Sequence, residues 1–205
     1  MARSFAKKAR NTKRRKQKPV MVLAAEGKNV TELQYILSFR SQHGKYAIHP
    51  HRTGHDTDPY GLLKSVEKYW RDNQLSKDLG DKAFILMDVD CDKKKADRFC
   101  KAIRDTEYAE FILSNPCFEV WYLFHFEKTT HVFLNGEEVI RRLKKHLPDY
   151  DKTTDVSSIL KERRGTALVH AMDIKKYHED NATPWPSADC NPMTDIPIII
   201  RELIE

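Results

Sequence analysis

Acidic side chains follow three apolar segments of the chain, at places where strands of a sheet would end. These side chains are Glu26, Asp88, Asp90 and Glu119. Carboxylates packed within a few ångströms repel one another and would take up protons unless a cation neutralised them. A set of oxygen ligands favours Mg²⁺ or Mn²⁺, which leave coordination positions for water and phosphate. Because such ions can orient and polarise a phosphate, the pattern indicates phosphodiester chemistry.

Four apolar segments, each followed by a helical pattern, would bring these acids together. We expect strands at 20–25, 46–52, 83–88 and 110–114, with helices at about 30–42, 59–73, 94–105 and after Asn115-Pro116. Strands that alternate with helices predict parallel strands, right-handed crossovers and a sheet covered on both faces. In such sheets the ligand lies outside the carboxyl ends of the strands. The predicted fold class is α/β, with a mainly parallel sheet of about four strands and a helical C-terminal portion.

The segment CFEVWYLFHF (117–126) is nearly all apolar, which predicts a buried helix. Its aromatic side chains could form a base-stacking platform, but they occur on both sides of the helix, and this favours core packing. His125 in the same segment is expected to be a core histidine. The chain at 136–180 predicts helices with short polar breaks, and TDIPIIIRELIE predicts a terminal helix.

The net charge of +6 is concentrated in the first 19 residues. This segment contains nine Lys or Arg and no acid, which leaves 27 basic against 30 acidic residues in the rest of the chain. We expect a disordered basic arm that follows a nucleic-acid backbone through charge, with Lys13, Arg14, Arg15 and Lys16 among its contacts. The alternative is a solubilising extension without a specific partner.

Two further basic clusters could line a nucleic-acid groove. One is Lys93, Lys94 and Lys95, directly after the second group of acids, and the other is Arg163 with Arg164. Solvated charge is the alternative for both clusters. Asp92, which precedes the first cluster, is expected to be a solvated loop acid.

Composition limits where the chain acts. No apolar run in the 205 residues approaches the roughly 20 residues of a membrane span, and no apolar stretch follows the first charges as in a secretory signal. The four cysteines match neither a CxxC zinc pair nor a dense disulfide framework. We therefore expect a cytoplasmic protein with reduced thiols and no membrane contact. No P-loop motif occurs, so any ATP sensing would need another protein.

Four motifs, in this order, resemble the RloB-like family over about residues 19–205. They are AEGKNVTE, MDVDCD, SNPCFEVWYLFHF and NPMT. The resemblance implies a catalytic core at 20–130 similar to the Toprim nuclease fold, preceded by the arm at 1–19 and followed by a helical extension at 131–205 packed on the core.

The resemblance also implies roles for the acids. A Glu after the first strand of a Toprim domain acts as general acid or base, and a DxD pair binds Mg²⁺; these roles fall to Glu26 and to Asp88 with Asp90. In Toprim nucleases of the overcoming-lysogenization-defect class, further acids contribute to a second metal, and the matching residues are Glu32 and Glu119. This chain has SNPCFE in place of the S-x-E-like element of that class.

Structural alternatives exist for three of these acids. Glu32 could complete a capping box with Asn29, three positions earlier. Glu119 could stabilise the start of a helix through its dipole. Asp88 could be structural, although a carboxylate directly after an apolar strand is difficult to bury without a partner.

The function implied by the resemblance is a Mg²⁺-dependent Toprim-type endonuclease that cleaves DNA or tRNA. It would act as a bacterial anti-phage effector in restriction or abortive-infection loci, often with an ATPase partner protein. The alternative is a non-catalytic nucleic-acid-binding subunit of a defence complex. The clustered acids disfavour this alternative, because a protein that only binds a polyanion has no reason to cluster acids that face it. A primase-like or topoisomerase-like module ranks third. The sequence leaves open the substrate, the number of metals, the oligomeric state and the activating trigger.

Overall fold

The structure, a computed structural model, describes residues 18–26, 31–41, 44–52 and 57–204. The predicted basic arm lies almost entirely outside this part of the chain, and so do Lys13, Arg14, Arg15 and Lys16. Within the described residues, no helix is long and apolar enough to cross a membrane. All four cysteines are free thiols, as their spacing predicted.

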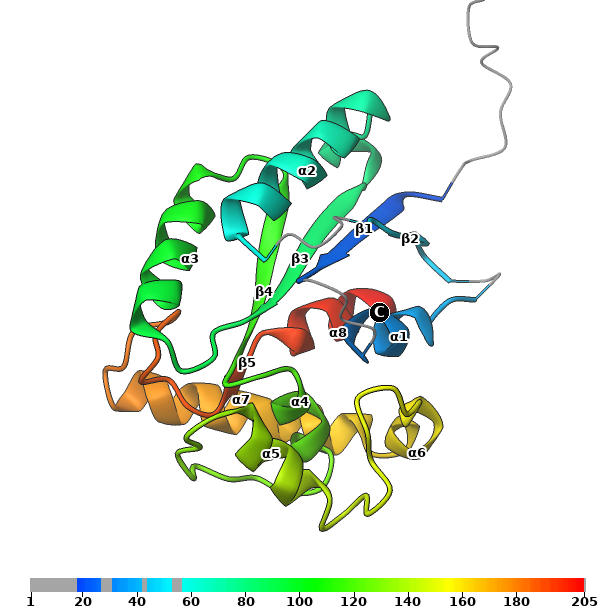
Figure 1. The fold of residues 1–205 in the computed structure, drawn as a ribbon. Coiled ribbons are helices and arrows are strands. Elements are labelled where there is room, and N and C mark those ends of the chain that lie inside the picture. Colours follow the sequence, from blue (N-terminus) through cyan, green and yellow to red (C-terminus); the bar gives the residue numbers. More distant parts are fainter. Residues whose placement is uncertain (1–17, 27–30, 42–43, 53–56, 205) are drawn as a thin grey trace, which may run out of the picture.

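Five strands form one sheet at the centre of the molecule (Figure 1). They are β1 (Val20–Ala25), β2 (Ala47–Pro50), β3 (Lys82–Asp88), β4 (Ala109–Asn115) and β5 (Met193–Thr194). Their order is β2-β1-β3-β4-β5; the first four are parallel, and β5 is antiparallel to β4. This confirms the α/β fold with a mainly parallel sheet, and four strands lie where the apolar runs predicted them. The two-residue β5 was not predicted, because it depends on its pairing with Ser114 and Asn115.

Eight α-helices and one 3₁₀ helix surround the sheet in the part of the chain that the structure describes. They are α1 (Thr31–Leu37), α2 (Pro59–Asp72), η1 (Lys77–Leu79), α3 (Lys93–Asp105), α4 (Glu119–Phe124), α5 (Gly136–Leu143), α6 (Ser157–Lys161), α7 (Arg164–Asp180) and α8 (Ile196–Ile204). Side chains that cap the helix N-terminus determine where some of these helices begin. Asp58 caps α2 by accepting a hydrogen bond from the Gly61 N–H at 3.1 Å.

Two hydrophobic clusters lie on opposite faces of the sheet. Leu62 of α2 and Phe99 of α3 belong to one cluster together with Ile85 of β3. α1, α4, α7 and α8 contribute to the other cluster, which includes Leu23 of β1. Ile199 of α8 is fully buried in this second cluster, so the C-terminal helices share a core with the sheet.

The apolar segment 117–126 forms a shorter helix than the pattern predicted. α4 spans only Glu119–Phe124, and all of its residues are buried. Trp121 and Tyr122 belong to the second cluster. Their burial agrees with core packing and not with a base-stacking platform.

Candidate active site

The carboxyl-terminal ends of β1, β3 and β4 bring predicted acids to one edge of the sheet. Glu26 directly follows β1, and its backbone N–H donates to the Leu86 carbonyl of β3 at 3.2 Å. Asp88 is the last residue of β3 and lies opposite Ser114 in the register with β4. Glu119 is the first residue of α4, which follows β4. Parallel strands therefore place these acids beside one another although they are far apart in the sequence.

Lys95 of α3 lies between two carboxylates of this site. Its Nζ donates to the two carboxylate oxygens of Glu26 at 3.1 and 2.9 Å and to Oδ2 of Asp90 at 2.7 Å. Burial lowers the pKa of Lys95, but its hydrogen bonds to Asp90 and Glu26 outweigh this effect and raise it. The ammonium group that the sequence predicted as a nucleic-acid contact is therefore paired with acids inside the site.

Glu32 and Asp88 are acids in surroundings that oppose their ionisation. Burial raises the pKa of Glu32 to about 7, and the nearby Glu119 adds to the rise. Burial also raises the pKa of Asp88 well above its usual range, with further contributions from Glu32, Glu119 and Asp90. Oε2 of Glu32 is buried and has no hydrogen-bond partner among the described residues. These carboxyl groups would be ionised more readily beside an added positive charge.

Two residues from the connection between α5 and α6 complete the surroundings of Glu119. The hydroxyl group of Tyr150 donates to Oε1 of Glu119 at 3.1 Å, and Nζ of Lys152 lies 3.8 Å from the same oxygen. Glu119 is buried, with 2% of its surface exposed. Sequence reasoning missed Tyr150 and Lys152, because only the tertiary fold brings this connection to the sheet edge. Glu119 also starts α4, as its structural alternative requires.

An open hollow of about 440 Å³ adjoins these acids. Its lining includes Asp88, Asp90, Cys117, Asn135, Glu137 and Lys152. Within the described part of the chain, no three His, Cys, Asp or Glu side chains are gathered as a metal-ligand group. The fit to a divalent cation rests on the chemistry of the donors: oxygen ligands, carboxyl groups that raise one another's pKa and a buried carboxylate oxygen without a partner.

The other residues of the first basic cluster lie at the start of α3. Nζ of Lys93 is 3.8 Å from Oδ1 of Asp189, and Lys94 is exposed. Asp92, expected to be a solvated loop acid, caps α3 by accepting hydrogen bonds from the N–H groups of Lys94 and Lys95 at 2.7 and 3.2 Å. Its exposed side chain therefore has a structural role at the helix terminus.

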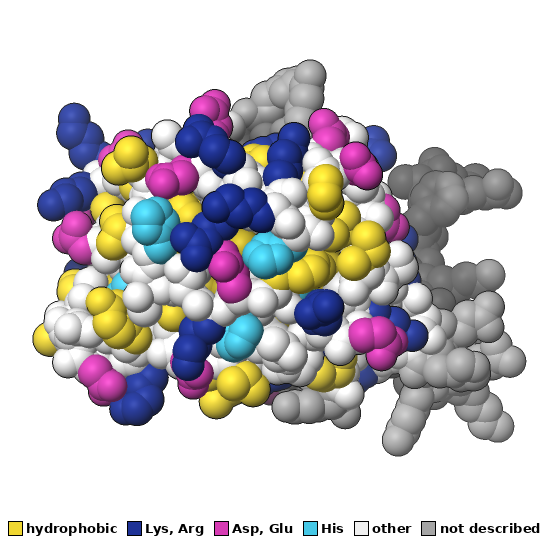
Figure 2. Space-filling view, turned by 90° about the horizontal axis from the view of Figure 1, so that it is seen from below, with side chains coloured by type: hydrophobic (Ala, Val, Ile, Leu, Met, Phe, Trp, Pro, Cys, Tyr) yellow, Lys and Arg dark blue, Asp and Glu magenta, His cyan; other side chains and the backbone are white. Residues whose placement is uncertain are grey.

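Arg163 and Arg164 of the second basic cluster lie over aromatic rings. The guanidinium carbon of Arg163 is 5.3 Å from the centroid of Phe126, and that of Arg164 is 4.0 Å from the centroid of Phe39. These distances are in the range of cation–π contacts. On the face seen from below Figure 1, the Lys and Arg side chains that the structure describes are interspersed with acidic and hydrophobic ones (Figure 2).

His125 lies in the core, in contact with the rings of Tyr35 and Trp121. It is fully buried, and its Nδ1 is 2.9 Å from the Trp121 carbonyl, to which it donates. Burial lowers the pKa of His125 to about 4, so the ring is neutral near pH 7. This position agrees with the expected core histidine.

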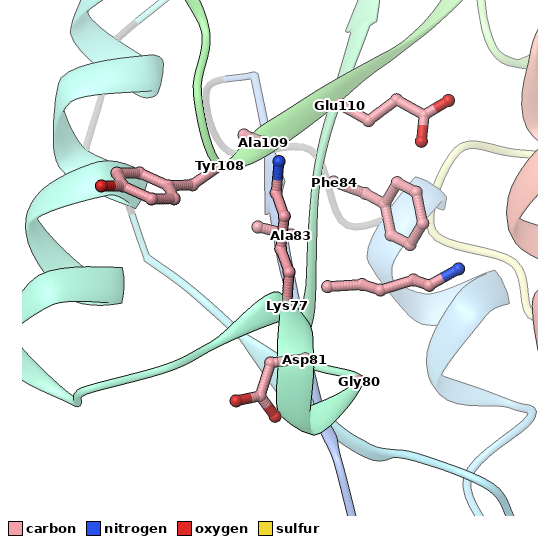
Figure 3. Close-up of a pocket in the computed structure, with 9 residues that line it drawn as sticks. Lys77, Gly80, Asp81, Ala83, Phe84, Tyr108, Ala109 and Glu110 are labelled. Carbon is pink, nitrogen blue, oxygen red and sulfur yellow. The ribbon is translucent and has the colours of Figure 1, made fainter.

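A second cavity, of about 300 Å³, lies beside the amino-terminal ends of β3 and β4, at the opposite edge of the sheet (Figure 3). Its lining includes Lys77, Asp81, Lys82, Tyr108 and Glu110. Asp81 accepts hydrogen bonds from the N–H groups of Val20 and Ser76 at 2.7 and 2.9 Å, and Lys82 pairs with Glu202. Because these charged groups already bind other parts of the fold, and no predicted site residue lines the cavity, the carboxyl edge is the better candidate.

Comparison with known proteins identifies a protein family. The family model described as RloB-like protein matches residues 21–203. No curated protein and no solved structure matches the chain.

Proposed function

The chain belongs to the RloB-like protein family, and we propose that it is a metal-dependent endonuclease with a Toprim-like core that hydrolyses phosphodiester bonds of DNA or tRNA. One observation carries the proposal. Glu26, Asp88 and Asp90 lie at or directly after the ends of the neighbouring parallel strands β1 and β3, and Glu32 and Glu119 are buried acids that raise the pKa of Asp88. A protein that only binds a polyanion has no evident use for such a cluster.

The residues that would hold Mg²⁺ or Mn²⁺ are Asp88 and Asp90 with Glu26, and Glu32 with Glu119 for a second ion. When bound, the metal would polarise the phosphate and favour ionisation of the attacking water. Glu26 has an 18% exposed side chain, so it can be reached from solvent while it is held by Lys95. Its proposed role is to accept or donate a proton at the scissile phosphate.

The two lysines of the site would bind the phosphate backbone. Lys95 is held by Glu26 and Asp90, and a competing positive charge on these acids would leave its ammonium group available for a phosphate oxygen. Lys152 lines the hollow and has a 59% exposed side chain, so it can be reached by a ligand there. Binding by these groups would orient a phosphodiester over Asp88 and Asp90.

The proposed biological role is that of an anti-phage effector in the cytoplasm, of the abortive-infection kind, with an ATPase partner protein that restrains or triggers cleavage. This part of the proposal depends on the family resemblance. The acids of the candidate site would supply the chemistry of cleavage, and the sequence has no P-loop for ATP.

The test is cleavage by the purified chain of plasmid, single-stranded DNA and total tRNA, each with Mg²⁺, Mn²⁺ or EDTA. We expect metal-dependent cleavage of one pool and its loss in Asp90→Asn. Asp92→Asn is the matched control, because Asp92 caps α3 and Asn is an equally good capping residue. Full cleavage by Asp90→Asn would contradict the proposed role of the acids.

A non-catalytic nucleic-acid-binding subunit is the second candidate, and one observation favours it. Lys95 pairs with both Glu26 and Asp90 and offsets one of their two negative charges, so part of the acidic site is compensated without a metal. Binding of nucleic acid without cleavage under every metal condition, in the presence of the partner protein, would support this candidate.

A further inference from the structure

The turn between β3 and α3 carries Asp90 in an uncommon backbone conformation. Asp90 and Cys91 both have φ of +57°, in the left-handed region that residues other than glycine rarely adopt. Two consecutive residues of this kind persist only where the surrounding structure supports them. One support is the hydrogen bond from the Asp90 N–H to the Pro116 carbonyl at 3.0 Å.

Asn115, the last residue of β4, provides a second support through its side chain. Its Oδ1 accepts a hydrogen bond from the Cys91 N–H at 2.9 Å. Its Nδ2 donates to the carbonyls of Ala188 and Cys190 at 3.0 and 2.8 Å and lies 3.3 Å from that of Ser187. Asn115 is fully buried, and both ends of its carboxamide are used. This residue therefore ties the acidic turn to the segment that precedes β5.

Asn191 contacts the same turn at the thiol group of Cys91. Its Nδ2 donates to the Phe133 carbonyl at 2.6 Å and lies 3.2 Å from Sγ of Cys91, while its Oδ1 accepts from the Phe133 N–H at 3.2 Å. It is 4% exposed. Asn115 and Asn191 stand in the motifs SNPCFE and NPMT, which are far apart in the sequence and meet at Cys91.

We propose that Asn115 and Asn191 are positioning residues that hold Asp90 in the geometry needed for metal binding. Only a carboxamide matches the contacts of Asn115, because Asp would place a carboxylate against backbone carbonyls, and a shorter side chain would not span both partners. The inference rests on the proposed function, since it assigns to the two asparagines a purpose in the metal site. It also gives the two asparagine-proline motifs a shared role.

The test compares Asn115→Ala with the wild-type chain in two measurements. Hydrogen exchange reports directly on the Cys91 amide, which should exchange faster once its acceptor is removed. Titration with Mn²⁺ should show affinity about 10- to 100-fold weaker, the usual cost of removing a group that orients a metal ligand. The double variant Asn115→Ala with Cys91→Gly should recover part of the affinity, because glycine adopts the left-handed conformation without steric cost.

Two variants separate positioning from a general loss of stability. Leu63→Ala removes a buried side chain of α2 in the other hydrophobic cluster, so it should lower the melting temperature and leave Mn²⁺ affinity unchanged below the transition. Asn191→Ala should weaken Mn²⁺ binding in the same direction as Asn115→Ala, and it serves as the test if the latter does not fold.

The possible failures are distinguishable. Faster exchange at Cys91 with unchanged Mn²⁺ affinity would overturn the positioning role and leave the proposed function intact. Absence of Mn²⁺ binding by the wild-type chain would overturn the proposed function and the positioning role together. Slow exchange of the Cys91 amide would then indicate that the hydrogen bonds of the turn only stabilise the fold.

Discussion

At the scale of single residues, Lys95 and the acids around it determine the charge of the site. Glu26, Asp88 and Asp90 were predictable from the sequence, because each follows an apolar strand in a parallel sheet. The pairing of Lys95 was not predictable, since α3 could have turned this side chain outward like its neighbour Lys94. The sequence pattern located the acids but not their counter-ion.

Lys95→Met should make the metal-free protein depend more strongly on an added cation. It removes the ammonium group that binds Glu26 and Asp90 and offsets one of their two negative charges. We expect a lower melting temperature in EDTA and a larger rise on addition of Mn²⁺ than in the wild-type chain. Lys94→Met, on the exposed side of the same helix, is the matched control. Equal melting temperatures of Lys95→Met and wild type in EDTA would contradict this role.

Glu32 should make the fold less stable as pH rises. Its pKa of about 7 in the folded chain lies above the ordinary value of 4.5, so the folded state binds the proton more tightly. The protonated Glu32 carboxyl group therefore adds on the order of 3 kcal/mol to the free energy of unfolding. This contribution is fully present below about pH 4.5 and is lost as the pH rises through 7. The raised pKa of Asp88 likewise lowers the stability of the fold as pH rises.

The measurement is urea unfolding in EDTA at pH 5, 6 and 8. Glu32→Gln should flatten the pH dependence, whereas Glu179→Gln, on the exposed part of α7, should leave it unchanged. A wild-type chain that is equally stable at pH 5 and 8 would contradict the raised pKa of Glu32.

At the scale of elements, continuous apolar runs predicted β1, β3 and β4 to within about one residue, because strands buried on both faces have little polar alternation. The bounds of the helix in segment 117–126 were harder to predict, because an apolar composition indicates that a segment is buried but does not determine the length of its helix. Tyr150 and Asn191 lie in connecting segments that the tertiary fold brings to the site. Their positions could not be predicted, because no local sequence pattern determines the course of these segments.

Helix α8 offers a test of how the C-terminal helices attach to the sheet. Ile199 is fully buried in the cluster that includes Leu23 of β1. Ile199→Ala should lower the free energy of unfolding by about 2–5 kcal/mol, in one transition that includes the sheet. Ile198→Ala, next to it and 38% exposed, should have a much smaller effect. Two separate unfolding transitions, with only one shifted, would indicate an independently stable C-terminal part.

At the scale of the whole molecule, the net positive charge is concentrated at one end of the sequence. The first 19 residues contain nine Lys or Arg and no acid, while the rest of the chain has 27 basic and 30 acidic residues. The sheet edge presents carboxylates that would repel a nucleic acid unless a cation or a basic segment offset them. The basic segment is therefore the part of the sequence best suited to attract a polyanion.

Deletion of residues 2–17 should weaken nucleic-acid binding and reduce its dependence on salt. The deleted segment contains eight of the nine basic residues, and the removal of each cation that binds a phosphate should lower the slope of log affinity against log salt by about one unit. Folding should be preserved, because the segment has no apolar periodicity. Binding isotherms at several salt concentrations provide the measurement, with an arm of equal length that has Gln in place of Lys and Arg as the control. An unchanged slope would show that the attraction comes from elsewhere, such as Lys152 or the lysines at the start of α3.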